Sequence, residues 1–198
     1  MNLVEILKKV KLRYPVVWDW VEDINGILLG KSRSQRMTDI KREILVFPPG
    51  HSRLVFRDAK KEDIPIIVEF LNHLSAEEVA HFRPFPFTDR SLGHVISCGT
   101  YQVYLAMSGN ELVGLFFLRF FINRQCYLGF AVNSSYRGKG IGKKMIEAMA
   151  SAVKDSGFQL MSTVCADNQA SIKAHMAAAR FEIVDRLSSN EIVLRLKG

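Results

Sequence analysis

The chain has 198 residues, of which 48% are hydrophobic and 24% are charged, which predicts a globular soluble protein of one domain with an appendage, or of two small domains. Lysine and arginine outnumber aspartate and glutamate by 27 to 20. The resulting net charge of +7 favours anionic partners without choosing among nucleic acid, an anionic membrane and a phosphate-rich cofactor. The most apolar stretch, residues 112–122, contains Arg119 and is too short to cross a bilayer as a helix.

Cysteine usage and the first residues indicate the compartment. Cys98, Cys126 and Cys165 are too far apart for a zinc knuckle, and any disulfide scheme leaves one of them over. The N-terminal residues are amphipathic and lack the basic-then-apolar order of a secretion signal. We therefore expect a cytoplasmic protein with buried thiols, no metal and no membrane attachment.

The N-terminal quarter of the chain has its own pattern. Apolar residues recur at helical spacing over residues 3–10, and Pro15 should limit that helix to the residues before it. The pair Asn25-Gly26 is a strong turn signal. The polar run 31–39 is typical of a solvated link.

A breaker, Pro48-Pro49-Gly50, separates this segment from a more regular pattern. We therefore predict a small N-terminal α+β appendage over residues 1–50 and a main domain over residues 51–198. In the main domain, strands are expected at 54–56, 101–107, 111–121, 126–132, 159–165, 181–187 and 191–196, helices at 63–74, 88–96, 142–155 and 168–179, and a loop at 81–87.

The most informative segment is a glycine-rich turn between an expected strand and an expected helix. Residues 137–142 read Arg-Gly-Lys-Gly-Ile-Gly, and Lys143 and Lys144 follow. Glycines let the backbone approach an anion closely, and the amides at a helix start point toward a phosphate whose charge the helix dipole favours. This segment therefore predicts a diphosphate-binding loop.

Two common phosphate motifs do not fit these residues. A Walker loop needs four residues between its first glycine and a Gly-Lys pair, with Ser or Thr next. Gly138 and Gly142 enclose three residues, and Lys144 stands at the hydroxyl position. The dinucleotide fingerprint needs two residues between its second and third glycines, whereas Ile141 alone separates Gly140 from Gly142.

The same loop fits the Arg/Gln-x-x-Gly-x-Gly/Ala motif and resembles the GNAT superfamily of N-acetyltransferases. The resemblance covers residues 52–198, whose expected elements follow the family's order, and residues 129–133 resemble the family's pantetheine-pairing strand. It implies an α/β fold with a mixed, splayed sheet flanked by helices. It also implies that an acetyl group passes from acetyl-CoA to a primary amine by direct attack in a ternary complex.

The resemblance further implies a cofactor site built from strand backbone, loop amides and a polar pair on the later helix. Phe130, Ala131 and Val132 would pair with pantetheine, and Asn168 and Ser171 would touch its arm. The pyrophosphate would be held by Arg137, Gly138, Lys139, Gly140, Ile141, Gly142 and Lys143.

The implied catalytic residues depart from the family's pattern. His175, which shares a helical face with Ser171, lies where the family often has a tyrosine that protonates the departing thiolate. Tyr127 lies about where a strand carboxylate often serves as base. After this helix the family usually has Gly-Phe, whereas residues 179–181 read Ala-Arg-Phe. The phenylalanine therefore comes one residue later than in the family's pattern.

The acceptor amine, with a pKa of about 10 if it is an alkylamine, must lose a proton before it attacks. A backbone amide near Phe130 would stabilise the oxyanion. Residues 81–87, rich in phenylalanine and proline, could stack on a sugar or nucleobase or pack over the core. The acceptor stays open among amino sugars, polyamines, amine antibiotics and protein amino groups, and a homodimer is possible. Candidate acceptor-site residues and bases are Glu77, Glu78, His81, Asp89 and His94.

Two other functions compete. A CoA-binding domain without transferase activity would be consistent with the missing strand carboxylate. Residues 140–144 also resemble the hairpin of a helix-hairpin-helix nucleic-acid binder, with which the positive charge agrees. That module needs a helix directly before the turn, where a strand is expected, so nucleic acid is the less favoured partner.

Overall fold

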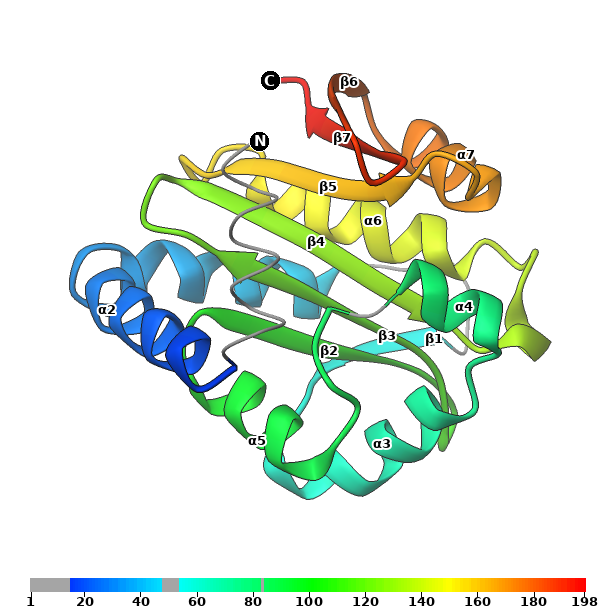
Figure 1. Ribbon diagram of the computed structural model, residues 1–198, viewed down its shortest axis with the longest axis horizontal. Coiled ribbons are helices and arrows are strands. Elements are labelled where there is room, and N and C mark those ends of the chain that lie inside the picture. Colours follow the sequence, from blue (N-terminus) through cyan, green and yellow to red (C-terminus); the bar gives the residue numbers. More distant parts are fainter. Residues whose placement is uncertain (1–14, 48–53, 83) are drawn as a thin grey trace.

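The computed structural model describes residues 15–47, 54–82 and 84–198, and the statements below refer to these residues. Seven strands form one open sheet in the order β1-β2-β3-β4-β5-β7-β6 (Figure 1). The β4–β5 pair is parallel and the other neighbours are antiparallel, so the sheet is mixed as expected. The strands are β1 (Leu54–Asp58), β2 (Tyr101–Ser108), β3 (Glu111–Phe120), β4 (Gln125–Val132), β5 (Gln159–Cys165), β6 (Phe181–Leu187) and β7 (Glu191–Leu196).

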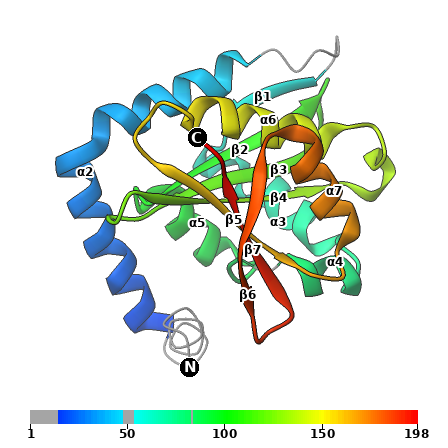
Figure 2. The same ribbon diagram turned by 90° about the horizontal axis from the view of Figure 1, so that it is seen from above.

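Helices cover both faces of this sheet (Figure 2). They are α2 (Pro15–Val46), α3 (Ile64–Asn72), α4 (Ala76–His81), α5 (Asp89–Ser97), α6 (Ile141–Val153) and α7 (Gln169–Ala178). Because successive residues of a strand point to opposite faces, Phe116 and Leu118 join the core beneath α2 and α6, whereas Leu115 and Phe117 join the core beneath α3 and α5. The result is a three-layer α/β/α arrangement.

The main-domain elements agree closely with the sequence pattern. Strands β5, β6 and β7 have the expected bounds, and Thr88 caps α5 by accepting a hydrogen bond from the Ser91 amide at 3.3 Å. Helix α4 was not expected. Its sequence signal is a capping box, in which Ser75 and Glu78 bond each other's backbone amides.

The phenylalanines after α4 pack over the core. Phe85 is 4% exposed, and its ring centroid lies 5.9 Å from that of Phe117. Phe82 lies 6.2 Å from the same ring, and Phe85 also contacts Tyr101. Packing therefore accounts for the rings of Phe82 and Phe85, the second of the two explanations that the sequence left open.

The expected turn at Asn25-Gly26 and the expected link at 31–39 are wrong. One helix, α2, runs through both, and the described part of the predicted α+β appendage is helical. Leu29, Met37, Ile40 and Ile44 of α2 are buried in the core that α6 shares. The expected helix at 3–10 lies outside the described residues, and the division at residue 50 stays a prediction.

Asn25 and Gly26 serve as docking residues. The Asn25 side chain donates to the Phe120 carbonyl at 2.9 Å and accepts from the Ile122 amide at 3.2 Å. A β-carbon on Gly26 would lie 2.3 Å from the Cys98 carbonyl oxygen, so glycine allows close approach of the helix. Tertiary contacts thus override the local turn preference. In the part of the chain that the structure describes, no helix is both long and apolar enough to cross a membrane.

Candidate active site

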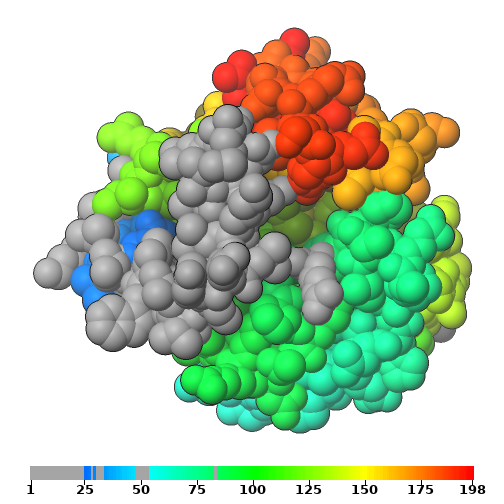
Figure 3. All heavy atoms as spheres, in the orientation of Figure 1, coloured from blue at the N-terminus to red at the C-terminus, as the bar shows by residue number. Residues whose placement is uncertain are grey.

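Strands β4 and β5 separate from each other along their length. They pair at Gln125–Tyr127 with Gln159–Met161, and the ladder ends there (Figure 1). Residues 128–132 of β4 remain paired with β3 on the other side. Within the described chain, the edge of β4 that faces β5 is therefore left without a partner strand from Leu128 onward. In the space-filling view this olive part of β4 lies in a recess between the orange-red C-terminal hairpin and the blue-green α4 region (Figure 3).

The glycine loop follows directly from this opening. Gly138 and Gly140 have φ values of 72° and 78°, a left-handed conformation that L side chains rarely adopt. Gly140 is the N-cap of α6, and the first helical bond runs from the Lys144 amide to the Gly140 carbonyl at 3.0 Å. Among the described residues, no acceptor is found for the amides of residues 138–143. Since the loop through Gly140 is exposed, these amides form a ready anion-binding site at a helix N-terminus.

The cations around the loop are held by nearby carboxylates and an aromatic ring. Arg137 forms an ion pair with Glu78 of α4. The Lys139 ammonium lies 4.4 Å from the centre of the Tyr136 ring, a cation–π contact. Lys143 and Lys144 both reach Glu147, at 3.5 Å and 2.8 Å, so this carboxylate offsets part of the local positive charge.

Helix α7 brings the predicted polar residues to the same region. Asn168 caps the helix by accepting a hydrogen bond from the Ser171 amide at 3.0 Å. One turn later the His175 Nδ1–H donates to the Ser171 carbonyl at 2.8 Å. The His175 ring lies 5.7 Å from Phe130 of β4 and 5.2 Å from Phe181. His175, Ser171 and Phe130 thus come together, and it is the serine backbone that contacts the imidazole.

The environment of His175 favours a neutral imidazole. The residue is 1% exposed, and burial lowers the pKa of His175 although the bond to the Ser171 carbonyl opposes that shift. Because a carbonyl can only accept, Nδ1 carries the proton and Nε2 the lone pair. Nε2 is buried and has no hydrogen-bond partner among the residues described. This tautomer presents an acceptor toward its surroundings instead of a proton donor.

The other candidate residues divide between two helices. Glu78 and His81 of α4 lie toward the glycine loop and the start of α7, where Glu78 meets Arg137 and His81 Nε2 lies 3.3 Å from Asp167 Oδ1. Glu77 on the same helix is exposed. Asp89 and His94 lie on α5, which packs on α3 and β2. Figure 1 places α5 at the opposite end of the sheet from α6 and α7, so the structure does not join these two residues to the others.

Tyr127 and Cys126 do not provide a base or nucleophile. Burial raises the pKa of Tyr127, so its phenol is protonated at neutral pH. Burial also strongly raises the pKa of the fully buried Cys126 thiol. The hydrogen bond that the Tyr136 hydroxyl donates to Glu111, 2.6 Å long, raises the pKa of Tyr136.

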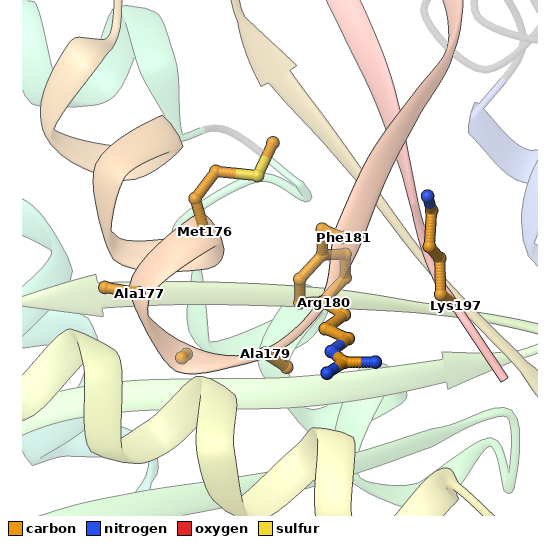
Figure 4. A pocket seen from close by; sticks show the side chains of 7 residues that line it. Met176, Ala177, Ala179, Arg180, Phe181 and Lys197 are labelled. Atoms are coloured by element: carbon orange, nitrogen blue, oxygen red, sulfur yellow. The ribbon is translucent and has the colours of Figure 1, made fainter.

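Two hollows flank these elements. A groove of about 560 Å³ lies between α3, α4, the β2–β3 turn and the residues after β4, and its lining includes Glu69, Glu78 and Glu111. A smaller hollow of about 360 Å³ is lined by residues 176–181 and Lys197 (Figure 4). It lies at the opposite end of α7 from Asn168. There α7 ends in an extended residue, Ala179, which replaces the left-handed glycine common at helix ends.

The open mixed sheet, the splayed strand pair and the unpaired amides at the start of α6 define a class of α/β acyltransferase. The model of the acetyltransferase (GNAT) family matches residues 68–178, more than half of the chain. The chain therefore belongs to this family and is an acetyltransferase by class. A comparison with curated proteins found no match.

Solved structures agree on the fold. RimL, a ribosomal L7/L12 α-N-protein acetyltransferase solved with coenzyme A, has a TM-score of 0.63 at 16% identity, covering 76% of this chain and 96% of its own. The acetyltransferase AAC(6')-Ib, solved with paromomycin and acetyl-CoA, has a TM-score of 0.58 at 18% identity, covering 74% of this chain and 93% of its own. A spermidine N-acetyltransferase from Vibrio cholerae, in complex with CoA and spermine, has a TM-score of 0.60 at 15% identity, covering 74% of this chain and 95% of its own.

Proposed function

We propose that this protein transfers the acetyl group of acetyl-CoA to a primary amine, by direct attack of the amine on the thioester in a ternary complex. The observation that carries the proposal is the run of amides at residues 138–143, for which the described residues offer no acceptor and of which those at 138–140 are exposed. This run follows a few residues after β4, whose β5-facing edge is unpaired from Leu128 onward. The loop amides can bind two linked phosphates. The unpaired edge of β4 can pair with an extended arm that carries amide groups.

In this proposal each part of the cofactor meets a different element. The pyrophosphate is held by the amides of 138–143, with Arg137 and Lys139 as counter-charges. The pantetheine arm pairs with β4 at Phe130, Ala131 and Val132, and contacts Asn168 and Ser171 at the start of α7. The thioester then lies near Phe130, where a backbone amide of β4 stabilises the oxyanion. The relatives solved with CoA or acetyl-CoA support this choice of donor.

We assign His175 a role through its buried Nε2. A neutral imidazole whose Nδ1–H is held by Ser171 accepts a hydrogen bond, and it can protonate a thiolate only after taking up a proton. His175 and Ser171 therefore remain the proposed catalytic pair, with Nε2 first taking up a proton from solvent and then giving it to the departing thiolate. For the amine's own proton, Glu77, Glu78 and His81 on α4 are better placed than Asp89 and His94 on α5.

The acceptor is proposed to be a cationic amine. Three carboxylates, Glu69, Glu78 and Glu111, line the groove that adjoins the loop, although the chain as a whole is positively charged. A carboxylate-lined groove attracts an ammonium group, which loses its proton before attack. The spermine complex of the spermidine N-acetyltransferase and the paromomycin complex of AAC(6')-Ib fit this class of acceptor. We place the reaction in the cytoplasm, on the sequence grounds given above, and without a metal cofactor.

Calorimetry with matched ligands tests the donor site. We expect Lys139→Ala and Arg137→Ala each to weaken CoA binding by about threefold to thirtyfold, because each removes a charge-assisted contact to the diphosphate. Binding of pantetheine, which lacks the diphosphate, should change by less than about twofold. Lys154→Ala, which removes an exposed lysine after the C-terminal end of α6, is the control and should leave both affinities unchanged.

Thiol release in the presence of a panel of amines then separates the functions. Release that depends on a cationic amine supports an acetyltransferase acting on that class. CoA binding without release from any amine would indicate the inactive CoA-binding domain, and the absence of heat with CoA together with binding to DNA would overturn the assignment.

A further inference from the structure

Three potential metal ligands from three segments meet beside the splayed strands. They are His81 at the end of α4, Cys165 at the end of β5 and Asp167 in the loop before α7. One ligand atom from each lies within 4.8 Å of the corresponding atoms of the other two. The sequence could not indicate this cluster, because His81 is far from the other two residues along the chain.

The separation of His81 Nε2 and Asp167 Oδ1 fits two ligands of a tetrahedral zinc ion, and Cys165 Sγ lies within 4.8 Å of the other ligand atoms. Zinc lies about 2.0–2.2 Å from imidazole nitrogen and carboxylate oxygen and about 2.3 Å from thiolate sulfur, so a tetrahedral N–O edge is about 3.3–3.5 Å. The observed distance between His81 Nε2 and Asp167 Oδ1 is 3.3 Å. Magnesium and calcium prefer all-oxygen sites, whereas a mixed set of nitrogen, sulfur and oxygen suits zinc.

The cluster is also open to incoming ions. The His81 side chain is 20% exposed and that of Asp167 is 66% exposed. Cys165 is partly exposed and, within the described residues, forms no disulfide. Three protein ligands leave one coordination position for water, as in zinc sites of the open kind.

We propose that His81, Cys165 and Asp167 bind a zinc ion that ties α4 to the corner between β5 and α7. Binding converts the Cys165 thiol to a thiolate, whose proton passes to solvent, and leaves the oxidation state of zinc unchanged. The site does not depend on the identity of the donor cofactor, and zinc bound to His81 would leave Glu77 and Glu78 as the candidates on α4 for the amine's proton. The sequence-based expectation of a protein without metal is revised by this proposal.

A zinc ion at this position would fix helix α4 across the opening between β4 and β5. Through Glu78, helix α4 contacts Arg137 of the glycine loop. Through His81, it contacts Asp167, which lies just before α7. It therefore spans the space between the two separated strands. A zinc ion at its C-terminal end replaces a single contact between His81 and Asp167 with three coordinate bonds, so bound zinc holds α4 in place across this opening.

Zinc titration of the full chain in a buffer with a competing chelator tests the site. We expect one zinc ion per chain, and binding at least about tenfold weaker in Cys165→Ser and in Asp167→Asn. Cobalt(II) is the spectroscopic probe: the parent should gain thiolate-to-cobalt charge-transfer absorption together with the strong visible bands of a tetrahedral site. Cys98→Ser, which replaces the other partly exposed thiol, is the matched control and should keep both properties.

Two results would overturn the proposal. One is a Cys165→Ser protein that binds zinc as tightly as the parent, which would leave only a direct contact between His81 and Asp167. The other is a parent protein that takes up less than one zinc ion per chain, or whose cobalt complex lacks the charge-transfer band. Circular dichroism of each variant confirms that it is folded, and Asp167→Asn, at an exposed loop position, provides a second test that does not alter a strand.

Discussion

At the scale of single residues, His175 has features that neither core packing nor solvation explains by itself. It is buried between the rings of Phe130 and Phe181, its Nδ1–H is committed to the Ser171 carbonyl, and its Nε2 has no partner in the described structure. A buried polar atom without a hydrogen bond costs stability, so its presence beside Phe130 of β4 favours a role in ligand binding.

The lowered pKa of His175 predicts a pH dependence of stability. The unfolded chain takes up a proton near the ordinary histidine pKa of about 6.5, whereas the folded chain does so only at lower pH. The free energy of unfolding should therefore fall as the pH drops from about 7 to about 5, by up to about 1.4 kcal/mol per pH unit from this residue. His175→Leu should flatten the fall, as measured by urea denaturation at each pH. His73→Gln, at an exposed histidine, should not, and equal slopes in His175→Leu and the parent would refute the assignment.

At the scale of elements, the short helix α4 connects the two sides of the opening. Its capping box fixes Glu78, whose two carboxylate oxygens bond the Ser75 amide and Arg137. Arg137 is thus already neutralised when no diphosphate is present. The strand pair behind it is kept apart by the register of β4 and β5, which share three residue pairs. The candidate site therefore lies where β4 and β5 stop pairing and helix α4 connects the two sides of the opening.

Releasing Arg137 from Glu78 should strengthen cofactor binding. In Glu78→Gln the side chain keeps its size and its place in the capping box but loses its charge. We expect the Kd for CoA to fall by up to about fivefold, because an exposed ion pair contributes up to about 1 kcal/mol. Calorimetry measures this, with Glu43→Gln, at an exposed carboxylate of α2, as the control. Weaker CoA binding in Glu78→Gln would contradict the expectation, and a hundredfold loss of transfer rate at unchanged affinity would make Glu78 the general base.

At the scale of the whole molecule, α2 belongs to the same core as the sheet. Its buried residues Leu29, Met37, Ile40 and Ile44 pack with α6, the helix whose N-terminus forms the glycine loop. Figure 2 shows α2 and α6 on one face of the sheet and α3, α4 and α5 on the other. The position of the loop therefore depends on a helix that the sequence pattern assigned to a separate appendage.

Gly26→Ala tests how closely α2 must approach the sheet. Alanine is favoured over glycine in a helix by about 1 kcal/mol, yet its β-carbon would lie 2.3 Å from a backbone carbonyl oxygen. We expect a net loss of about 1–3 kcal/mol in the free energy of unfolding, measured in urea. Gly93→Ala in α5, whose added β-carbon would lie 3.8 Å from the nearest atom, is the matched control and should be neutral or stabilising. A Gly26→Ala protein as stable as the parent would mean that α2 does not dock there.

The sequence by itself determined most of the main-domain elements and the glycine loop at the start of α6. These depend on local causes, namely side-chain periodicity, turn residues and the glycines at 138, 140 and 142, which act within a few residues of each other. Only the tertiary structure decided that Asn25 and Gly26 dock a helix instead of turning the chain, because their partners at Cys98, Phe120 and Ile122 are distant in sequence. For the same reason it alone placed Glu78 on Arg137 and brought His81 to Cys165 and Asp167. Contacts between segments far apart in the chain leave no periodic signal in either segment.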